Sequence, residues 1–372
     1  MKALVVGAGI SGLAASIALS HQGVEVELAE RRPDVEALGS GITLIGPALR
    51  ALSMLGVVDQ CVTQGYGMTT FETLDIHGKL ASRFELPSPV GVEQPGMVGM
   101  MRPALHRVLL DQALQNGTTI RTRTEPTRID NRPGAPTEVT FNDGSQAPYD
   151  LVAGADGVHS TVRDLIFGRM PLTFRGQATV RVVLPRPQEV TGEVQYHPVG
   201  DVFVGFTPTS SDSMYMYCSF PVTPDDWPTQ AEIVELVRRK TEPFGGLVNR
   251  VRDLITDPGQ VNLAKFKTIL MPNPWARGRT VIIGDAAHCP TPQLAAGAAM
   301  CLEDAVALAE EIGAATSVEA ALANFCERRY ERCRFVVDTA CQLSHWQTYP
   351  GTLGTEHERV TAEAFALLAQ PF

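Results

Sequence analysis

The chain has 372 residues, 44% of them hydrophobic and 19% charged, which is enough for about two globular domains of ~100–200 residues each. Its formal net charge of −10 argues against broad contact with nucleic acid or with an anionic membrane surface. No apolar run reaches the ~20 residues of a membrane helix, the N-terminus lacks a secretory signal, and the 7 cysteines show no metal-ligand spacing. The composition therefore predicts a soluble, cytoplasmic protein without a metal site and without a nucleic-acid or membrane partner.

The first 30 residues predict a buried strand, a glycine-rich turn, a helix and a second strand. In the turn, GAGISG at residues 7–12, Gly7 allows a tight turn, Gly9 lets backbone approach a pyrophosphate, and Gly12 lets the helix pack on the strand. The start of the helix offers free N–H groups to phosphates. Glu30 closes the second strand and can accept hydrogen bonds from a ribose diol, which predicts FAD or NAD and excludes NADP. The candidate contacts are Gly7, Gly9, Ile10, Ser11, Gly12 and Glu30, with Arg31 either near the phosphates or simply exposed.

Residues 150–157 predict another buried strand, which ends in the turn GADG. A helix is expected over residues 158–163, where Asp156 and Arg163 would exchange charge-assisted hydrogen bonds. An Asp-Gly turn that binds nothing is the alternative interpretation. Asp156, Gly157 and Arg163 are the candidate cofactor contacts of this segment.

The middle of the chain is typical of a β-sheet. A hairpin is expected over residues 70–86, and strand-like runs rich in Val, Tyr and Phe follow at 178–184, 193–197, 202–206 and 214–220. A helix is expected over 233–240, and a returning strand over 263–271. We interpret these segments as an antiparallel sheet that covers a cofactor.

Three side chains in this sheet are candidate catalytic residues. Arg181 stands among valines, where an unpaired charge would be costly, so it either faces a ligand or lies on the solvent side of its strand. Tyr215 and Tyr217 alternate with methionines and share one face, where they could bind a phenol oxygen or pack in a core.

A third glycine turn, GDAAH at residues 284–288, follows a buried strand at 280–283. Ligands of open α/β sheets bind at this end of the strands, and Asp285 can accept from a hydroxyl of a cofactor's sugar chain. His288 could touch a flavin or be structural. A small-residue segment and a helix over 300–312 come next, and residues 317–345 are also expected to be helical. The candidate contacts here are Gly284, Asp285, Pro292, Gly297 and Ala298.

Over roughly residues 1–340 the chain resembles the group A flavoprotein monooxygenases, the para-hydroxybenzoate hydroxylase-like family. GAGISG with Glu30, GADG and GDAAH match that family's three FAD motifs. Arg102 matches the family's arginine that approaches the FAD pyrophosphate, and residues 39–44 resemble its segment near the flavin, which adds Gly41 and Ile42. Ala295 and Ala299 depart from a glycine and an asparagine of the family pattern, although backbone contacts survive Gly→Ala where φ is negative.

The resemblance implies an α/β fold with a Rossmann-like FAD-binding domain of the GR2 type, an inserted antiparallel β-sheet substrate domain and C-terminal helices. The FAD domain would comprise residues 1–70, 97–165 and 275–340, the substrate domain 71–96 and 166–274, and a helical tail 341–372. Arg181 matches a position where relatives often place a polar residue on the substrate side.

The activity implied is that of a monooxygenase in which NADH or NADPH reduces FAD. A C4a-hydroperoxyflavin formed with O2 would then insert one oxygen into a small phenolic or N-heteroaromatic substrate. An FAD-dependent reductase or dehydrogenase without oxygen insertion is the alternative. The expected assembly is a monomer or a homodimer.

Overall fold

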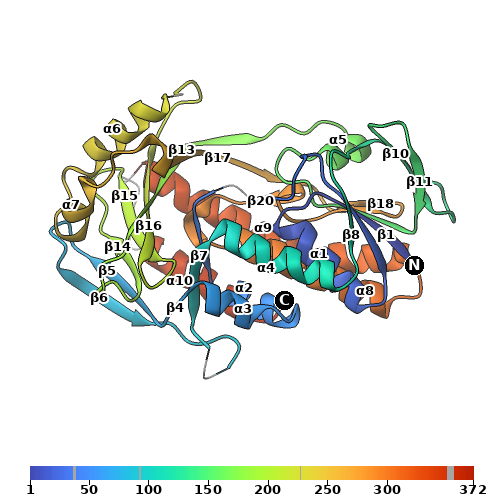
Figure 1. Cartoon of the computed structure of the whole chain (residues 1–372), viewed down its shortest axis with the longest axis horizontal. Coiled ribbons are helices and arrows are strands. Elements are labelled where there is room, and N and C mark those ends of the chain that lie inside the picture. The colour runs from blue at the N-terminus through green and yellow to red at the C-terminus, as the bar shows by residue number, and fades with distance from the viewer. Residues whose placement is uncertain (37–38, 92–93, 227, 350–355) are drawn as a thin grey trace.

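The structure, a computed structural model, describes residues 1–36, 39–91, 94–226, 228–349 and 356–372. Residues 92–93 of the predicted substrate domain and 350–355 of the predicted tail lie outside the described residues. Figure 1 shows a six-stranded sheet at the end that carries the N-terminus, an eight-stranded sheet at the opposite end, and long helices between them. None of the helices that the structure describes combines the length and the apolar character that a membrane-spanning helix needs.

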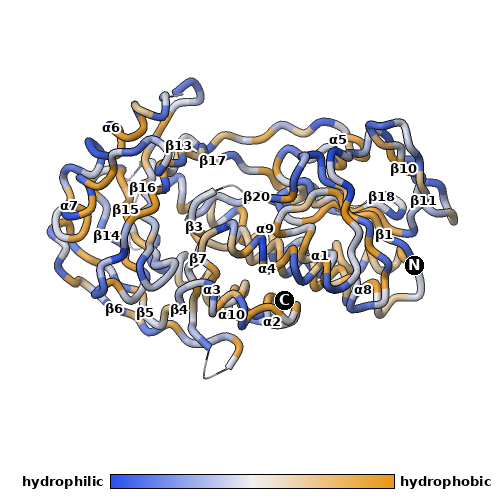
Figure 2. Tube along the Cα trace, in the orientation of Figure 1, coloured by the Kyte–Doolittle hydropathy of each residue, from blue (hydrophilic) through white to orange (hydrophobic). Residues whose placement is uncertain are grey.

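The six-stranded sheet has the order β18-β19-β12-β1-β2-β8 and is parallel except for its edge pair β18–β19. Its central strands β1 and β12 carry mostly apolar, buried side chains, as expected for a parallel sheet that is covered on both faces, and Figure 2 shows hydrophobic residues concentrated around β1. The predicted strands of all three glycine motifs are confirmed as members of this sheet. Its strands are β1 (Lys2–Val6), β2 (Glu25–Ala29), β8 (Thr119–Arg121), β12 (Leu151–Gly154), β18 (Ala276–Arg277) and β19 (Thr280–Ile282).

Five helices pack on this sheet or on one another. The helix α1 is buried along most of its length and packs against both α4 and α8, which explains its lack of a polar face. The helix after the second motif begins at Thr161, three residues later than expected. The bounds are α1 (Ile10–His21), α4 (Arg102–Gln115), α5 (Thr161–Phe167), α8 (Gly297–Ala314) and α9 (Val318–Thr348).

Two small sheets complete this half of the molecule. One has the order β11-β10-β9 and the other β3-β7-β4. The second carries the segment predicted to lie near the flavin, and α2 and α3 pack beside it. The elements are β3 (Gly41–Leu44), α2 (Gly46–Met54), α3 (Val58–Gln64), β4 (Tyr66–Met68), β7 (Met97–Met101), β9 (Pro126–Asp130), β10 (Thr137–Phe141) and β11 (Gln146–Tyr149).

The eight-stranded sheet has the order β20-β17-β13-β16-β15-β14-β5-β6 and contains every strand predicted in the middle of the chain. One expectation is wrong, because β14 and β5 pair in parallel and the sheet is therefore mixed. This happens because the early hairpin β5–β6 adds to the edge of strands that come more than a hundred residues later. The bounds are β5 (Thr70–Leu74), β6 (Leu80–Glu85), β13 (Thr173–Pro185), β14 (Glu193–Tyr196), β15 (Phe203–Pro208), β16 (Ser213–Pro221), β17 (Val261–Leu270) and β20 (His288–Cys289).

One face of this sheet packs a second hydrophobic core against α6 (Gln230–Thr241) and α7 (Gly246–Arg252). Val180 and Val182 point to that core, so the side chains that alternate with them point to the other face. The remaining elements are α10 (Glu356–Ala369) and the short helices η1 (Pro258–Gln260), η2 (Gly284–Ala286) and η3 (Pro292–Leu294). The helix α9 runs unbroken through residue 341, so the tail boundary predicted there does not separate two elements.

Candidate functional site

The three glycine motifs, far apart in the sequence, meet at the carboxyl ends of β1, β12 and β19. A Cβ on Gly7 would lie 2.7 Å from the Ala155 carbonyl oxygen, and a Cβ on Gly284 would lie 2.6 Å from the Ser11 hydroxyl. The first and the third motif therefore each have a glycine where another motif approaches it. Convergence at this edge of the sheet is the geometry expected for a nucleotide site in an open α/β fold.

The glycines of the first motif have distinct roles. Gly7 has φ +102°, a conformation that favours glycine, and a Cβ on Gly12 would lie 1.8 Å from the Gly7 carbonyl oxygen. A Cβ on Gly9 would meet nothing within 4 Å, so the backbone there faces open space. Gly9 is also the N-cap of α1 and no side chain caps this helix, which leaves its first N–H groups free to bind a ligand.

The open space is a cavity of about 330 Å³ lined by the first motif, the end of β2, the GADG turn and α4. The Glu30 carboxylate accepts from the Ala8 N–H at 2.8 Å and from the Arg32 N–H at 2.9 Å, which fixes it at the cavity wall. His106, which the sequence analysis did not single out, bonds the Ala8 carbonyl oxygen through Nε2 at 2.7 Å and also lines the cavity.

These residues fit the ADP half of FAD. A pyrophosphate needs free N–H donors and close backbone approach, which the uncapped α1 and Gly9 provide. The Ser11 hydroxyl is buried without a hydrogen-bond partner in the described part of the chain. Arg31, Asp156 and Gly157 also line the cavity.

The expected pairing of Asp156 with Arg163 is wrong. Asp156 accepts from the Thr161 and Val162 N–H groups at 2.6 and 3.0 Å, because the first turn of α5 presents unsatisfied donors to it. Burial raises the pKa of Asp156, although these bonds oppose that effect. Arg163 instead donates to the carbonyl oxygens of Val158 and Ala286, both at 3.1 Å. It therefore connects the second motif to the third.

The charge of Arg102 acts on the carboxyl group of Asp285. Burial raises the pKa of Asp285, and the positive charges of His288 and Arg102 oppose that shift. Arg102 begins α4, and a Cβ on Gly39 would lie 3.1 Å from its Cδ. The arginine that the resemblance assigned to the FAD pyrophosphate is thus close to the third motif.

His288 is structural. It is 1% exposed, and its Nε2 lies 2.6 Å from the Asp304 carboxylate. The same carboxylate accepts from the Gly284 N–H at 2.8 Å and from Arg329 Nε at 2.8 Å, so it fixes the GDAAH turn from beneath. His288, Asp304 and Cys333 lie within 4.8 Å of one another, but the donors around Asp304 make this group an ion-pair network.

The segment after GDAAH departs from the expected backbone. Ala295 has φ +50°, in the left-handed region, so the negative φ under which alanine could replace the family glycine is absent. Left-handed backbone costs a non-glycine residue about 1 kcal/mol. Pro292 begins η3. Gly297 and Ala298 begin α8, so the N-terminus of α8 is formed by two of the residues predicted to contact the cofactor.

The candidate catalytic residues lie together on the inner face of the eight-stranded sheet. Arg181 stands opposite Tyr217 and Val183 opposite Tyr215, so all of them point away from the second core. A Cβ on Gly41 would lie 1.9 Å from the Tyr215 ring, and the Tyr215 hydroxyl bonds the Thr43 hydroxyl at 2.6 Å. The sheet therefore packs directly on the β3 segment expected near the flavin.

Arg181 has no hydrogen bond or ion pair with any residue that the structure describes. Burial lowers the pKa of its guanidinium; Tyr215 opposes that shift and Arg102 adds to it. A half-buried cation without a partner and beside another cation is electrostatically suited to receive an anion or a strong hydrogen-bond acceptor.

The family described as FAD binding domain matches residues 1–340. This chain belongs to that family. It is 32% identical over 342 residues to 2-heptyl-3-hydroxy-4(1H)-quinolone synthase of Pseudomonas aeruginosa, covering 90% of this chain and 87% of the relative. It is also 29% identical over 318 residues to 3-amino-4-hydroxybenzoate 2-monooxygenase of Streptomyces cremeus, covering 83% and 77%.

A solved structure of Klebsiella pneumoniae HpxO with FAD and uric acid matches with a TM-score of 0.85 and 24% identity, covering 100% of this chain and 97% of that one, and supports the fold. As a member of the FAD binding domain family, the protein is an FAD-dependent monooxygenase that uses NAD(P)H and O2. The resemblance to group A flavoprotein monooxygenases and the α/β Rossmann-like fold class are confirmed.

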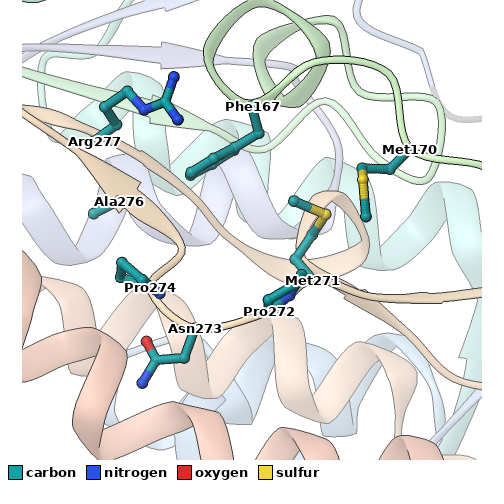
Figure 3. A pocket seen from close by; sticks show the side chains of 8 residues that line it. All are labelled: Phe167, Met170, Met271, Pro272, Asn273, Pro274, Ala276 and Arg277. Carbon is teal, nitrogen blue, oxygen red and sulfur yellow. The ribbon is translucent and has the colours of Figure 1, made fainter.

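Another hollow is lined by residues 167, 170, 271–274, 276 and 277. It has a volume of about 340 Å³, and Figure 3 shows its wall, in which Arg277 extends beside Phe167. None of the site residues predicted from the sequence lines it. The sequence analysis did not single out Thr43, Thr207 and Glu193; Thr207 pairs with Tyr215, and Glu193 lies opposite Thr207 on a strand that was predicted correctly.

Proposed function

We propose that this enzyme inserts one oxygen atom from O2 into a small aromatic substrate, phenolic or N-heteroaromatic, that lies between the eight-stranded sheet and the flavin. Arg181, Tyr215 and Tyr217 would line its binding site. The observation that carries the proposal is the unpaired guanidinium of Arg181, which faces the β3 side beside two tyrosines. The relatives named above, a quinolone synthase and an aminohydroxybenzoate monooxygenase, support a ring substrate.

FAD, when bound, transfers electrons from NADH or NADPH to O2 and so supplies the oxygen chemistry. This chain's residues bind and orient it. We assign the phosphates to the first motif and the N-terminus of α1, the adenosine ribose to Glu30, and the sugar chain to Asp285. The further contacts that we assign are Arg31, Gly41, Ile42, Arg102, Asp156, Gly157, Arg163, Gly284, Pro292, Gly297 and Ala298.

The residues that would line the substrate site would act through charge and through the exclusion of water. Arg181 would stabilise negative charge on a substrate oxygen, and an ionised ring oxygen makes the ring a better target for an electrophilic oxygen donor. Tyr215 is largely buried, and its hydroxyl hydrogen-bonds the Thr43 hydroxyl. The tyrosine ring would therefore be held in place and would close one side of the substrate site.

The division into an FAD domain of residues 1–70, 97–165 and 275–340 and a substrate domain of 71–96 and 166–274 follows from this assignment. We also propose that the protein works as a monomer or a homodimer in the cytoplasm, without a nucleic-acid or membrane partner. All 7 cysteines are free, which suits a reducing compartment, and the net charge is −10.

Product mass tests the proposal. The purified protein would be incubated with FAD, NADH or NADPH, O2 and a panel of phenols and N-heteroaromatics. A product heavier than its substrate by one oxygen atom supports the proposal. A product that differs by two hydrogen atoms would instead support the reductase or dehydrogenase alternative.

A further inference from the structure

A buried carboxyl group lies in the middle of the inner face of the eight-stranded sheet. Glu193 on β14 is 5% exposed, and it has no ion pair within the described chain. Its Oε2 atom has no hydrogen-bond partner among the described residues. Burial of an uncompensated carboxylate is costly, so a merely structural position would favour an apolar residue or glutamine.

The register of the sheet places Glu193 on the face that carries the proposed substrate-binding residues. Val194 pairs with Phe206, which places Glu193 opposite Thr207, and Thr207 in turn pairs with Tyr215. Residues opposite one another in neighbouring strands point to the same face. Glu193 therefore shares the inner face with Thr207 and Tyr215, on the side away from the second core.

Tyr217 is directed toward this carboxyl group by a glycine. Tyr217 pairs with Gly205 of β15, where a Cβ would lie 2.1 Å from the Tyr217 hydroxyl. The tyrosine thus crosses the strand between itself and β14, and its hydroxyl reaches the vicinity of the Glu193 carboxyl group, as does the Thr207 hydroxyl. On its other side Tyr217 stands opposite Arg181.

Resting on the function proposed above, we propose that Glu193 accepts, through Tyr217, the proton of a hydroxyl on the substrate ring. The substrate class would then be hydroxylated aromatic or heteroaromatic rings, bound as the oxyanion beside Arg181.

The proton transfer is balanced within the site. The O–H bond of the substrate breaks and its proton moves to the Tyr217 oxygen, while the Tyr217 proton moves to a Glu193 carboxylate oxygen. Tyr217 is regenerated, Glu193 becomes a neutral acid, and the negative charge moves to the substrate oxygen. The charge of the site is unchanged, and no electrons are transferred.

The acidity of the groups suits this role. Burial raises the pKa of Glu193 to about 8, while Thr207 and Tyr217 oppose that effect. Such a carboxylate is a far better base toward a phenol, with a pKa of ~10, than one with an ordinary value. The titratable groups that face it are Tyr215 and Tyr217 of β16, with Arg181 of β13 beyond them; Thr207 of β15 and Phe71 of β5 do not titrate.

Ligand ionisation tests the proposal without turnover. The FAD-loaded protein, without NADH or NADPH, would be titrated at about pH 9 with 4-methylphenol, whose pKa of ~10 keeps it mostly protonated in solution, with the phenolate measured by difference absorbance and proton release by a pH indicator. Wild type should bind the phenolate without releasing a proton. Glu193→Gln should bind the neutral phenol, or bind the phenolate while releasing about one proton for each ligand bound.

Two further variants keep the test decisive. Tyr217→Phe retains Glu193 but interrupts the relay, and it should lose the proton-neutral binding in the same way. Glu189→Gln makes the same chemical change at an exposed ion pair with Arg250, and it should behave as wild type. Identical phenolate fractions and proton counts in wild type and Glu193→Gln at every pH would overturn the inference.

Turnover separates this inference from the function on which it rests. With a phenol that the enzyme converts to a hydroxylated product, wild-type kcat should rise as the pH passes through about 8. The Glu193→Gln variant should show no such rise, and its kcat should be lower roughly a hundredfold. An unchanged pH profile in the variant would count against the relay. Proton-neutral phenolate binding without any oxygenated product would contradict the proposed function alone, and no phenol binding by wild type would contradict the substrate class and the relay together.

Discussion

The Tyr217 hydroxyl occupies the space that a side chain on Gly205 would need, since a Cβ there would lie 2.1 Å from the hydroxyl oxygen. The relationship crosses one strand of the sheet, because Gly205 belongs to β15 and Tyr217 to β16. Because Gly205 has no side chain, the Tyr217 ring can extend across β15, and its hydroxyl is directed toward Glu193.

Gly205→Ala is expected to displace Tyr217 and to lower kcat with a phenolic substrate at least about tenfold, because a 1 Å misplacement in an active site costs up to a hundredfold. FAD content should be unchanged. Steady-state kinetics and the flavin absorbance check both expectations. Gly259→Ala, at an exposed position, is the matched control. Wild-type kinetics in Gly205→Ala would contradict the role of the glycine.

Arg181→Ala is expected to lower kcat/KM about a hundredfold or more, because it removes the charge assigned to the substrate oxygen. Flavin binding should remain. Arg181→Lys should recover part of the activity, since it keeps the charge but loses the planar fork. Arg128→Ala removes an exposed arginine on β9 and serves as the control. Unaltered kinetics in Arg181→Ala would remove Arg181 from the site.

Glu30→Gln is expected to raise the Kd for FAD at least about tenfold, which corresponds to ~1.4 kcal/mol. Glutamine accepts hydrogen bonds less strongly than a carboxylate, and the bonds from the Ala8 and Arg32 N–H groups should weaken as well. Flavin fluorescence titration of the apoprotein measures the Kd. Glu25→Gln, on an exposed residue of the same strand, should leave it unchanged. An unchanged Kd in Glu30→Gln would argue against the ribose contact.

Asp304→Asn is expected to lower the free energy of unfolding by about 3–5 kcal/mol, because it leaves His288 buried without a carboxylate and Arg329 with Glu303 as its one remaining partner among the described residues. Chemical denaturation measures this change. Asp338→Asn, on an exposed residue of α9, should change it by less than about 0.5 kcal/mol. A loss equal to that of the control would mean that the network does not stabilise the fold.

The same carboxylate gives a dependence on acid. Burial alone would raise the pKa of Asp304, but His288 and Arg329 hold it at about 2, below the ordinary 3.8. A carboxyl with a depressed folded pKa stabilises the fold above its unfolded pKa and loses that contribution as the pH falls. The free energy of unfolding should therefore decline between pH 4 and 2 in wild type, and Asp304→Asn should decline less steeply.

Ala295→Gly should raise the free energy of unfolding by up to about 1 kcal/mol, because it relieves left-handed backbone and the entropy of the unfolded glycine offsets only part of that gain. Thermal unfolding with and without FAD measures the change. Ala298→Gly, inside the first turn of α8, should be destabilising instead. A lower Tm in Ala295→Gly would show that alanine is not strained there.

The glycine motifs could be predicted from the sequence because their chemistry depends on local spacing. Gly7, Gly9 and Gly12 lie within six consecutive residues, and the strands that precede the motifs are short apolar runs. The pairing of Asp156 with Arg163 was wrong because the N–H groups of α5 compete for the carboxylate, and only the actual start of the helix decides that competition.

Glu193 could not be recognised as a site residue from the sequence. Its role depends on the register of β14 against β15 and on the absence of a side chain at Gly205, and a shift of one residue would turn Glu193 to the opposite face. The parallel pairing of β14 with β5 was missed for a similar reason, since strands distant in sequence carry no local signal of their neighbour.

Flavin absorbance of the purified protein, followed without oxygen on addition of NADH or NADPH, tests the central claim most directly. The account predicts a yellow protein whose flavin is reduced faster when a hydroxylated ring compound is present, and which yields a product with one added oxygen once O2 is admitted. A colourless protein that does not take up FAD would contradict it.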